Sequence, residues 1–200
     1  MKKISKGLVL GLMLATGDVL IGAATANAMP MTTGRTTSQP IGHYEFCHRY
    51  RAACQPQRVS NAVPLTGANW KTLVDVNNAV NTSIFPREDM AMHGKADVWS
   101  YPTSEGDCED YVLLKQYMLQ QAGFPTSALL ITVVLQSNGE GHAVLTVRTD
   151  KGDMILDNLA DQVRPWYETE YLYLKRQSER HAGEWVGISD DRSLLVGSLR

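Results

Sequence analysis

The chain has 200 residues, of which 44% are hydrophobic and 20% are charged, and its net charge at pH 7 is -2. This composition is sufficient for one folded domain with an ordinary core, and it has none of the bias of disordered chains. The nearly balanced charge provides no broad basic surface. Nucleic acid is therefore excluded as an expected partner.

Residues 1–28 have the features of an export signal. Three lysines among the first six residues precede an apolar run over residues 7–15, and residues 26–28 have the small-x-small pattern of a signal-peptidase site. The run is shorter than the about 20 residues of a membrane-spanning helix, and Asp18, which is atypical of a signal, follows it. We expect cleavage after Ala28 and a mature chain in an oxidising compartment.

The next segment, residues 29–42, is rich in Thr, Ser, Gly and Pro, which predicts a flexible stretch ahead of a single domain over residues 43–200. Cys47 and Cys54 lie close together, and a short disulfide between them is the economical interpretation, leaving Cys108 free. The alternative is a metal site of Cys47, His48 and Cys54, which lacks a clear fourth ligand.

The middle of the chain predicts two helices separated by a long loop. Apolar residues recur at helical spacing from Trp70 to Ile84, and Met90 to Glu105 is an irregular stretch that we expect to form one wall of a cleft. The second helix is predicted from Cys108 to Ala122, because Gly123 and Pro125 end it.

Three extended segments follow, separated by turn residues. They are residues 128–136, 142–149 and 154–157, and we expect them to form an antiparallel sheet. Residues 167–185 then supply aromatic and apolar surface in a segment whose type, helical or extended, stays open.

Cys108 lies in the run Gly106-Asp107-Cys108-Glu109-Asp110-Tyr111, at the predicted start of a helix. Unpaired backbone N–H groups and the positive end of the helix dipole favour the nucleophilic thiolate at such a position. A buried structural cysteine beside ordinary helix-start acids is an equally good interpretation of this run alone.

A catalytic cysteine requires a base and a group that orients the base. His142 begins the second predicted strand and Asp157 ends the third, with Asp161 as a second choice. A tight turn at Lys151-Gly152 leaves His142 and Asp157 about four residues out of register, so a bulge or wider loop must close the gap. The other histidines, of which His93 has the best claim to catalysis, are expected at the surface.

The acids around Cys108 suggest a second function. Asp107 and Glu109 offer hard oxygen ligands of the kind that calcium prefers. From spacing alone, capping of the helix by Asp107 and dipole stabilisation by Glu109 are the favoured roles. However, flanking carboxylates raise the pKa of a thiol, and a bound cation relieves that repulsion.

The sequence resembles the bacterial transglutaminase-like cysteine proteinases, which include the periplasmic LapG-type proteases that release biofilm adhesins. The resemblance covers residues 70–185. Its most specific pieces are Asp97-Val98-Trp99 with Pro102, the run of residues 106–111, Gly141-His142-Ala143-Val144-Leu145 and Leu156-Asp157-Asn158-Leu159.

The resemblance implies an α+β fold of the papain-like, transglutaminase-like kind, with the cysteine on a helix packed against an antiparallel sheet. It implies a triad of Cys108, His142 and Asp157 and a regulatory calcium ion on Asp107 and Glu109. It also implies a periplasmic location, a protein substrate such as a surface adhesin, and an inner-membrane regulatory receptor.

Together these patterns predict an exported cysteine peptidase that acts through a thioester. A transglutaminase that passes the acyl group to an amine shares the same triad, so the sequence leaves it open. A non-catalytic calcium-dependent binding module is the alternative from another class, and the intact order of the three triad residues disfavours it.

Overall fold

In the computed structural model, residues 29–190 and 192 are described, so the predicted export signal and the last eight residues lie outside them. The helices of the described part are α1 Ile41–Arg49, η1 Arg51–Cys54, α2 Gly67–Ser83, α3 Asp89–His93, α4 Cys108–Gln121, η2 Thr126–Ala128 and η3 Trp166–Glu168. Its strands are β1 Thr32–Thr37, β2 Phe85–Pro86, β3 Glu105–Gly106, β4 Leu129–Leu135, β5 Gly141–Thr149, β6 Gly152–Leu156, β7 Arg164–Pro165, β8 Leu172–Gln177 and β9 Trp185–Ser189.

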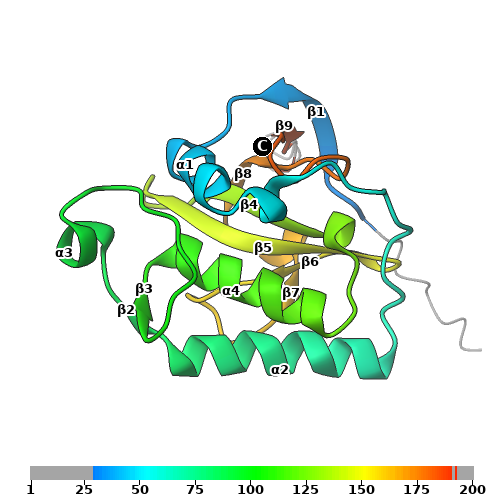
Figure 1. The fold of residues 1–200 in the computed structure, drawn as a ribbon. Helices are drawn as coiled ribbons and strands as arrows, with labels where there is room; N and C mark the ends of the chain where they lie inside the picture. The colour runs from blue at the N-terminus through cyan, green and yellow to red at the C-terminus, as the bar shows by residue number, and fades with distance from the viewer. Residues whose placement is uncertain (1–28, 191, 193–200) are drawn as a thin grey trace, which may run out of the picture.

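Seven of the strands form one antiparallel sheet in the order β1-β9-β8-β4-β5-β6-β7. Helix α4 packs on β4 and β5, and α2 packs on α4, which gives the layers sheet, α4 and α2 in Figure 1. The predicted mixture of helices and antiparallel sheet is therefore confirmed.

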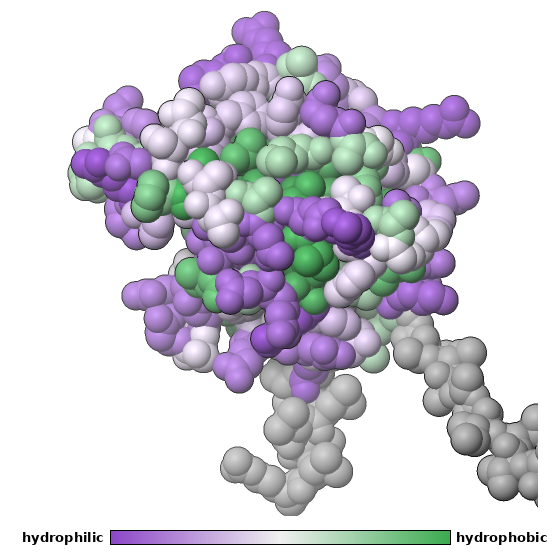
Figure 2. Space-filling view, turned by 90° about the horizontal axis from the view of Figure 1, so that it is seen from below, coloured by the Kyte–Doolittle hydropathy of each residue, from purple (hydrophilic) through white to green (hydrophobic). Residues whose placement is uncertain are grey.

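The sheet buries apolar side chains on both faces. Ala143, Leu145 and Val147 of β5 belong to the large core that includes α2 and α4, whereas Val144 belongs to a smaller cluster on the other face with Trp166. This alternation follows from the two-residue period of a strand. Viewed from the α2 side, hydrophilic side chains cover much of the surface around a band of apolar ones (Figure 2).

The segment over residues 29–42, which the sequence predicted to be flexible, contains regular secondary structure. Strand β1 pairs with β9, although all six of its residues are exposed, and α1 begins at Ile41. Further anchoring comes from the backbone N–H of Met31, which donates to Asp153 Oδ2 at 2.9 Å. Backbone pairing at a sheet edge needs no apolar side chains, so polar composition gave no signal for it.

Helices α2 and α4 and strands β4, β5 and β6 confirm the five predicted elements to within a few residues. The segment over residues 167–185, whose type the sequence left open, includes the end of η3, the whole of β8 and the first residue of β9. The expected loop over residues 90–105 contains most of α3 and begins β3. None of the helices in the described residues has the length and apolar character needed to cross a membrane.

The turn between β5 and β6 differs from the sequence expectation. Thr149 pairs with Gly152, so the hairpin loop is Asp150-Lys151 rather than Lys151-Gly152. Since Leu145 pairs with Leu156, His142 is opposite position 159, and Asp157 is two residues from direct register instead of four. A diagonal neighbour at this offset is within reach of a long side chain.

Candidate active site

Cys108 is the first residue of α4 and faces a cavity of about 620 Å³. His142, from the beginning of β5, lines the same cavity. The loop that carries Ala96 and Asp97 forms part of its wall, as expected from the sequence. Helix α4 and strand β5 thus bring the predicted nucleophile and base to one cavity from positions 34 residues apart in the chain.

His142 and Asp157 form a buried hydrogen-bonded pair. His142 Nε2 lies 2.8 Å from Asp157 Oδ1, and both side chains are only 3% exposed. An ionised carboxylate can only accept, so Nε2 carries the proton and Nδ1 is left as the acceptor. Burial raises the pKa of Asp157, but hydrogen bonds from His142, Tyr171 and the Leu159 N–H outweigh it and hold the pKa below the usual value.

Two asparagines of α2 hold the backbone of Asp157. The Asp157 N–H donates to Asn77 Oδ1 at 3.1 Å, and Asn81 Nδ2 donates to the Asp157 carbonyl at 2.9 Å. Asn77 and Asn81 are one helical turn apart, so both reach the backbone of the same residue. Helix α2 therefore places a candidate catalytic residue.

The thiol of Cys108 donates to its neighbour Glu109, with Sγ 2.8 Å from Oε2. Among the described residues no hydrogen bond joins this thiol to His142. Burial and then the Glu109 carboxylate raise the pKa of Cys108 well above its usual range, the Ala143 backbone N–H lowers it, and Asp107 raises it further. The expected activation by the helix N-terminus is thus outweighed in this arrangement.

Three carboxylates converge near the start of α4. One oxygen each of Asp89, Asp107 and Asp110 lies within 4.8 Å of the others. Asp89 Oδ1 and Asp107 Oδ1 are buried and have no hydrogen-bond partner among the described residues. Burial, followed by repulsion from Glu109, Asp110 and Asp89, raises the pKa of Asp107 to about 9.

Asp110 has a similar environment, since burial raises its pKa to about 7 although hydrogen bonds from Ser100 oppose the shift. The group Asp89, Asp107 and Asp110 differs from the pair of Asp107 and Glu109 that we expected as metal ligands, because Glu109 is turned toward the thiol. Clustered hard oxygens with unpartnered buried atoms fit a divalent cation such as calcium. The sequence did not indicate Asp89 as a ligand, because this residue lies 18 positions before Asp107. Only the position of α3 in the fold brings it to the cluster.

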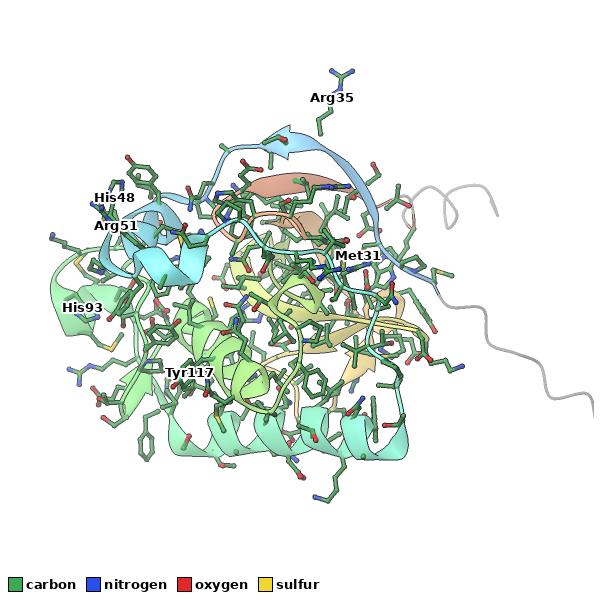
Figure 3. The ribbon with its side chains drawn as sticks, turned by 45° about the vertical axis from the view of Figure 1, so that its right-hand side comes forward. Met31, Arg35, His48, Arg51, His93 and Tyr117 are labelled. Carbon is green, nitrogen blue, oxygen red and sulfur yellow. A yellow bond between two sulfur atoms is a disulfide. The ribbon has the colours of Figure 1, made fainter. Side chains whose placement is uncertain are left out.

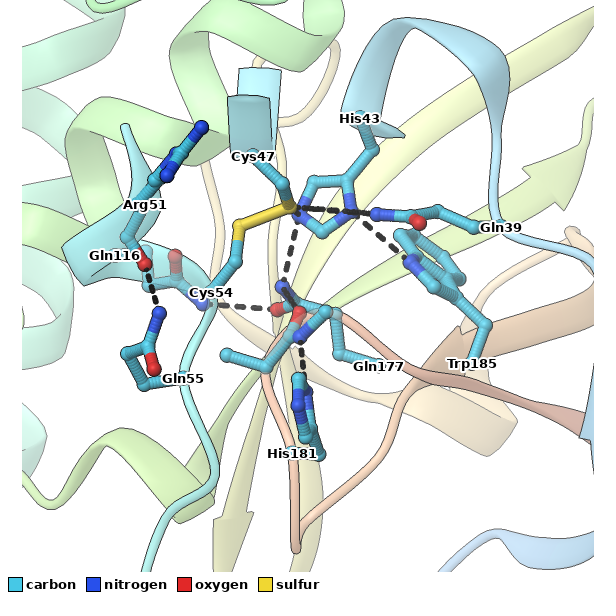
Figure 4. Close-up of a disulfide and its surroundings, with 12 residues drawn as sticks. Gln39, His43, Cys47, Arg51, Cys54, Gln55, Gln116, Gln177, His181 and Trp185 are labelled. Carbon is cyan, nitrogen blue, oxygen red and sulfur yellow. Dashed lines mark hydrogen bonds between the residues drawn. A yellow bond between two sulfur atoms is a disulfide. The ribbon is translucent and has the colours of Figure 1, made fainter. Parts of the chain in front are cut away.

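The disulfide between Cys47 and Cys54 is present and joins α1 to η1 (Figure 4). It excludes the alternative metal site, because both sulfur atoms are used. His48 and His93 lie at the surface, as expected, on α1 and α3 (Figure 3).

His43 contradicts its predicted surface position. It is 1% exposed, with its ring beside Phe46, Trp99 and Trp185, and burial lowers its pKa to about 4. The sequence around His43 did not predict this burial, because Trp99 and Trp185, which cover it together with Phe46, come from distant segments.

The fold and the arrangement of the candidate site are typical of a cysteine peptidase of the transglutaminase-like class. The sequence profile of the bacterial transglutaminase-like cysteine proteinases (BTLCP) matches residues 33–193, and the chain belongs to this family. It is therefore a cysteine peptidase, as the sequence predicted. None of the curated proteins compared with the chain matches it.

Solved structures of LapG from Legionella pneumophila are similar to this fold. One has a TM-score of 0.51 and 23% identity, covering 66% of this chain and 74% of its own. The calcium-bound form has a TM-score of 0.51 and 19% identity, covering 68% of this chain and 83% of its own. At this level of identity the likeness concerns the fold.

Proposed function

We propose that the chain is a cysteine endopeptidase whose triad is Cys108, His142 and Asp157. The observation that carries the proposal is the buried bond of His142 Nε2 to Asp157, which leaves Nδ1 as a proton acceptor in the cavity that Cys108 also lines. An oriented imidazole next to a thiol at a helix start is the arrangement that nucleophilic catalysis needs.

In the proposed reaction His142 Nδ1 takes the thiol proton, and Cys108 Sγ forms a bond to the peptide carbonyl carbon. The backbone N–H of Cys108 helps to stabilise the oxyanion. The imidazolium then gives its proton to the departing amine as the C–N bond breaks, leaving a thioester. Water, deprotonated by His142, attacks the thioester, and the thiol leaves with the proton.

We further propose that Asp89, Asp107 and Asp110 hold a calcium ion. Bound there, the ion would supply positive charge that offsets the carboxylates around the thiol. The support is the two unpartnered buried oxygens together with the likeness to the calcium-bound LapG structure. Glu109, the other expected ligand, accepts a hydrogen bond from the thiol of Cys108. Loss of this hydrogen bond would leave the thiol free to donate to His142.

The test is alkylation of the purified protein by iodoacetamide, with calcium or with EGTA, followed by mass spectrometry to locate the adduct. We expect rapid modification of Cys108 with calcium and slow modification with EGTA. Modification no faster than in the urea-unfolded protein would contradict the proposal and favour a non-catalytic binding module.

A second experiment separates the peptidase from a transglutaminase, which shares the thioester. The protein is incubated with a mixed peptide library in the presence and absence of a labelled primary amine. New peptide N-termini support the peptidase. Incorporation of the amine at glutamine side chains without new N-termini would support acyl transfer instead.

The location and partners of the enzyme form the last part of the proposal. The sequence pattern of residues 1–28 and the family resemblance support an exported, periplasmic enzyme that cleaves a surface protein such as an adhesin. The same resemblance supports control by an inner-membrane receptor. Comparison of surface proteins between cells with and without the gene tests the substrate, since the substrate should accumulate uncut in the deletion strain.

A further inference from the structure

The carboxylate of Asp157 has one oxygen that the proposed triad does not use. Oδ1 accepts from His142 Nε2 at 2.8 Å and from the Leu159 N–H at 3.0 Å. Oδ2 accepts from the hydroxyl of Tyr171 at 2.5 Å. With both oxygens bonded, the carboxylate cannot rotate about its terminal torsion without breaking a hydrogen bond, although that torsion is intrinsically soft.

Tyr171 also contacts the other member of the buried pair. Its ring centroid is 5.6 Å from that of His142, with the two planes inclined at 51°. One side chain therefore touches the imidazole with its ring and the carboxylate with its hydroxyl. Tyr171 immediately precedes β8, which pairs with β4, which in turn pairs with β5, so the sheet fixes its position relative to His142.

Tyr171 stays a donor across the physiological range. Burial, followed by its hydrogen bond to Asp157 and the charge of that residue, raises the pKa of the Tyr171 hydroxyl well above its usual value. The same hydrogen bond lowers the pKa of Asp157. The other ionisable group whose charge acts on Asp157 from the helical layer is Lys115 of α4.

We propose that Tyr171 is a positioning residue of the active site: its hydroxyl locks the Asp157 carboxylate so that Oδ1 faces His142 Nε2, and its ring limits the tilt of the imidazole. This inference rests on the proposed function, because it gives Tyr171 a role only if His142 is the base. The proposal gives a role in the active site to a residue of segment 167–185, for which the sequence predicted only aromatic and apolar surface.

Tyr173 provides a matched control two residues along the chain. It is 2% exposed, its hydroxyl is 2.9 Å from Thr169 Oγ1, and its ring packs at right angles on Trp166. It makes no hydrogen bond to the triad. Tyr171→Phe and Tyr173→Phe thus each remove a hydroxyl from one segment, but only the first change removes a hydrogen bond to Asp157.

The experiment measures the rate of Cys108 alkylation by iodoacetamide at neutral pH with saturating calcium in the wild type and in both variants. Because Tyr171→Phe removes a hydrogen bond to a charged group, it should slow alkylation about tenfold or more. Tyr171→Ala, which also removes the ring, should slow it further. Tyr173→Phe should match the wild type, and the thermal unfolding midpoints show whether each variant is folded.

A second readout addresses the position of the carboxylate itself. The proton on His142 Nε2, shared with Asp157, should give a strongly deshielded proton NMR signal that disappears when Asp157 is protonated at low pH. Without the Tyr171 hydroxyl Asp157 takes up its proton at a higher pH, so the signal of Tyr171→Phe should disappear earlier on acidification. If Tyr171 had only a structural role, its replacement by Phe would not change the pH at which the signal disappears.

The outcomes distinguish the two proposals. If Cys108 of the wild type reacts no faster than in the unfolded protein, the proposed function fails. If the wild type reacts rapidly but Tyr171→Phe has the same rate and the same NMR behaviour as Tyr173→Phe, only the role of Tyr171 is refuted. A slow Tyr171→Phe with an unchanged unfolding midpoint and an earlier loss of the signal supports it.

Discussion

The two sides of the catalytic cavity differ in how completely the chain satisfies their polar groups. On the sheet side, both carboxylate oxygens of Asp157 and the Nε2 of His142 are hydrogen-bonded. On the helix side, Asp89 and Asp107 each have a buried oxygen without a hydrogen-bond partner among the described residues. The Cys108 thiol is hydrogen-bonded to Glu109 instead of His142. In our proposal, folding alone orients the base, whereas the carboxylates around the nucleophile are offset by a bound cation.

The largest expected effect comes from removing the nucleophile. Cys108→Ala should lower peptide cleavage by about 10⁴-fold or more, because no thioester can form. The low-field NMR signal of His142 should persist, because the sheet side does not depend on the thiol. Cleavage is measured with the peptide library, and loss of the NMR signal would show that the two sides are not independent.

The second prediction concerns the acidic cluster. Asp89→Asn should lower the rate of Cys108 alkylation in calcium by about 100-fold, if removing one ligand charge costs about 2–3 kcal/mol of ion binding. The control is Glu88→Gln, which removes a charge from the exposed neighbouring residue. Calcium should raise the unfolding temperature of the wild type and of Glu88→Gln, but not of Asp89→Asn. Equal calcium responses in the three proteins would contradict the assigned ligands.

The third prediction uses the disulfide to disturb the helix side alone. The cleft wall is attached to α1, because the Gly42 N–H donates to Asp97 Oδ2 at 2.7 Å and Arg49 donates to the Trp99 carbonyl at 2.6 Å. The double variant Cys47→Ser/Cys54→Ser should lose about 2 kcal/mol of stability, as expected for a loop this short. It should also need more calcium for alkylation.

Urea unfolding and a calcium titration of the alkylation rate measure these two effects. The His142 signal should be unchanged in the double variant, because α1 makes no hydrogen bond to His142 or Asp157 in the described part of the chain. A change in that signal with no change in the calcium requirement would show that the disulfide supports the sheet side of the cavity and not the helix side.

The sequence predicted the elements that follow side-chain periodicity and missed those that do not. Helices α2 and α4 and strands β4 to β6 have clear apolar patterns, so they were found. Strand β1 has no buried side chain within it and was missed. Helix α1 was also missed, because its buried residues Gly42, His43 and Phe46 include only one large apolar side chain.

The candidate site shows the same limit. Cys108, His142 and Asp157 were identified from local motifs, but the two-residue register shift that lets Asp157 reach His142 depends on the choice of turn. Asp89 and Tyr171 are isolated residues with no local pattern, so only the three-dimensional fold brings them to the site. Glu109 stays a predicted ligand, although its carboxylate accepts the hydrogen bond of the Cys108 thiol in this structure.

The smallest predicted effect concerns Lys115, a cation buried between the two sides. It is on α4 and fully buried, and its side-chain nitrogen has no hydrogen-bond partner in the part of the chain that the structure describes. Burial lowers the pKa of Lys115 to about 7, although the charge of Asp157 opposes the shift. Between these two pKa values the folded protein therefore binds fewer protons at Lys115 than the unfolded chain, in which the pKa of a lysine is about 10.4.

It follows that the contribution of Lys115 to stability rises with pH between about 7 and about 10.4 and is least favourable below about 7. Lys115→Met keeps the apolar stem and removes this cost, so it should stabilise the protein at neutral pH by about 1 kcal/mol or more and flatten the pH dependence in that range. Urea unfolding at several pH values measures both effects. The control Lys71→Met alters an exposed lysine and should change neither. Destabilisation by Lys115→Met would instead indicate that the ammonium charge supports ionised Asp157, in which case the two sides of the cavity are coupled through α4.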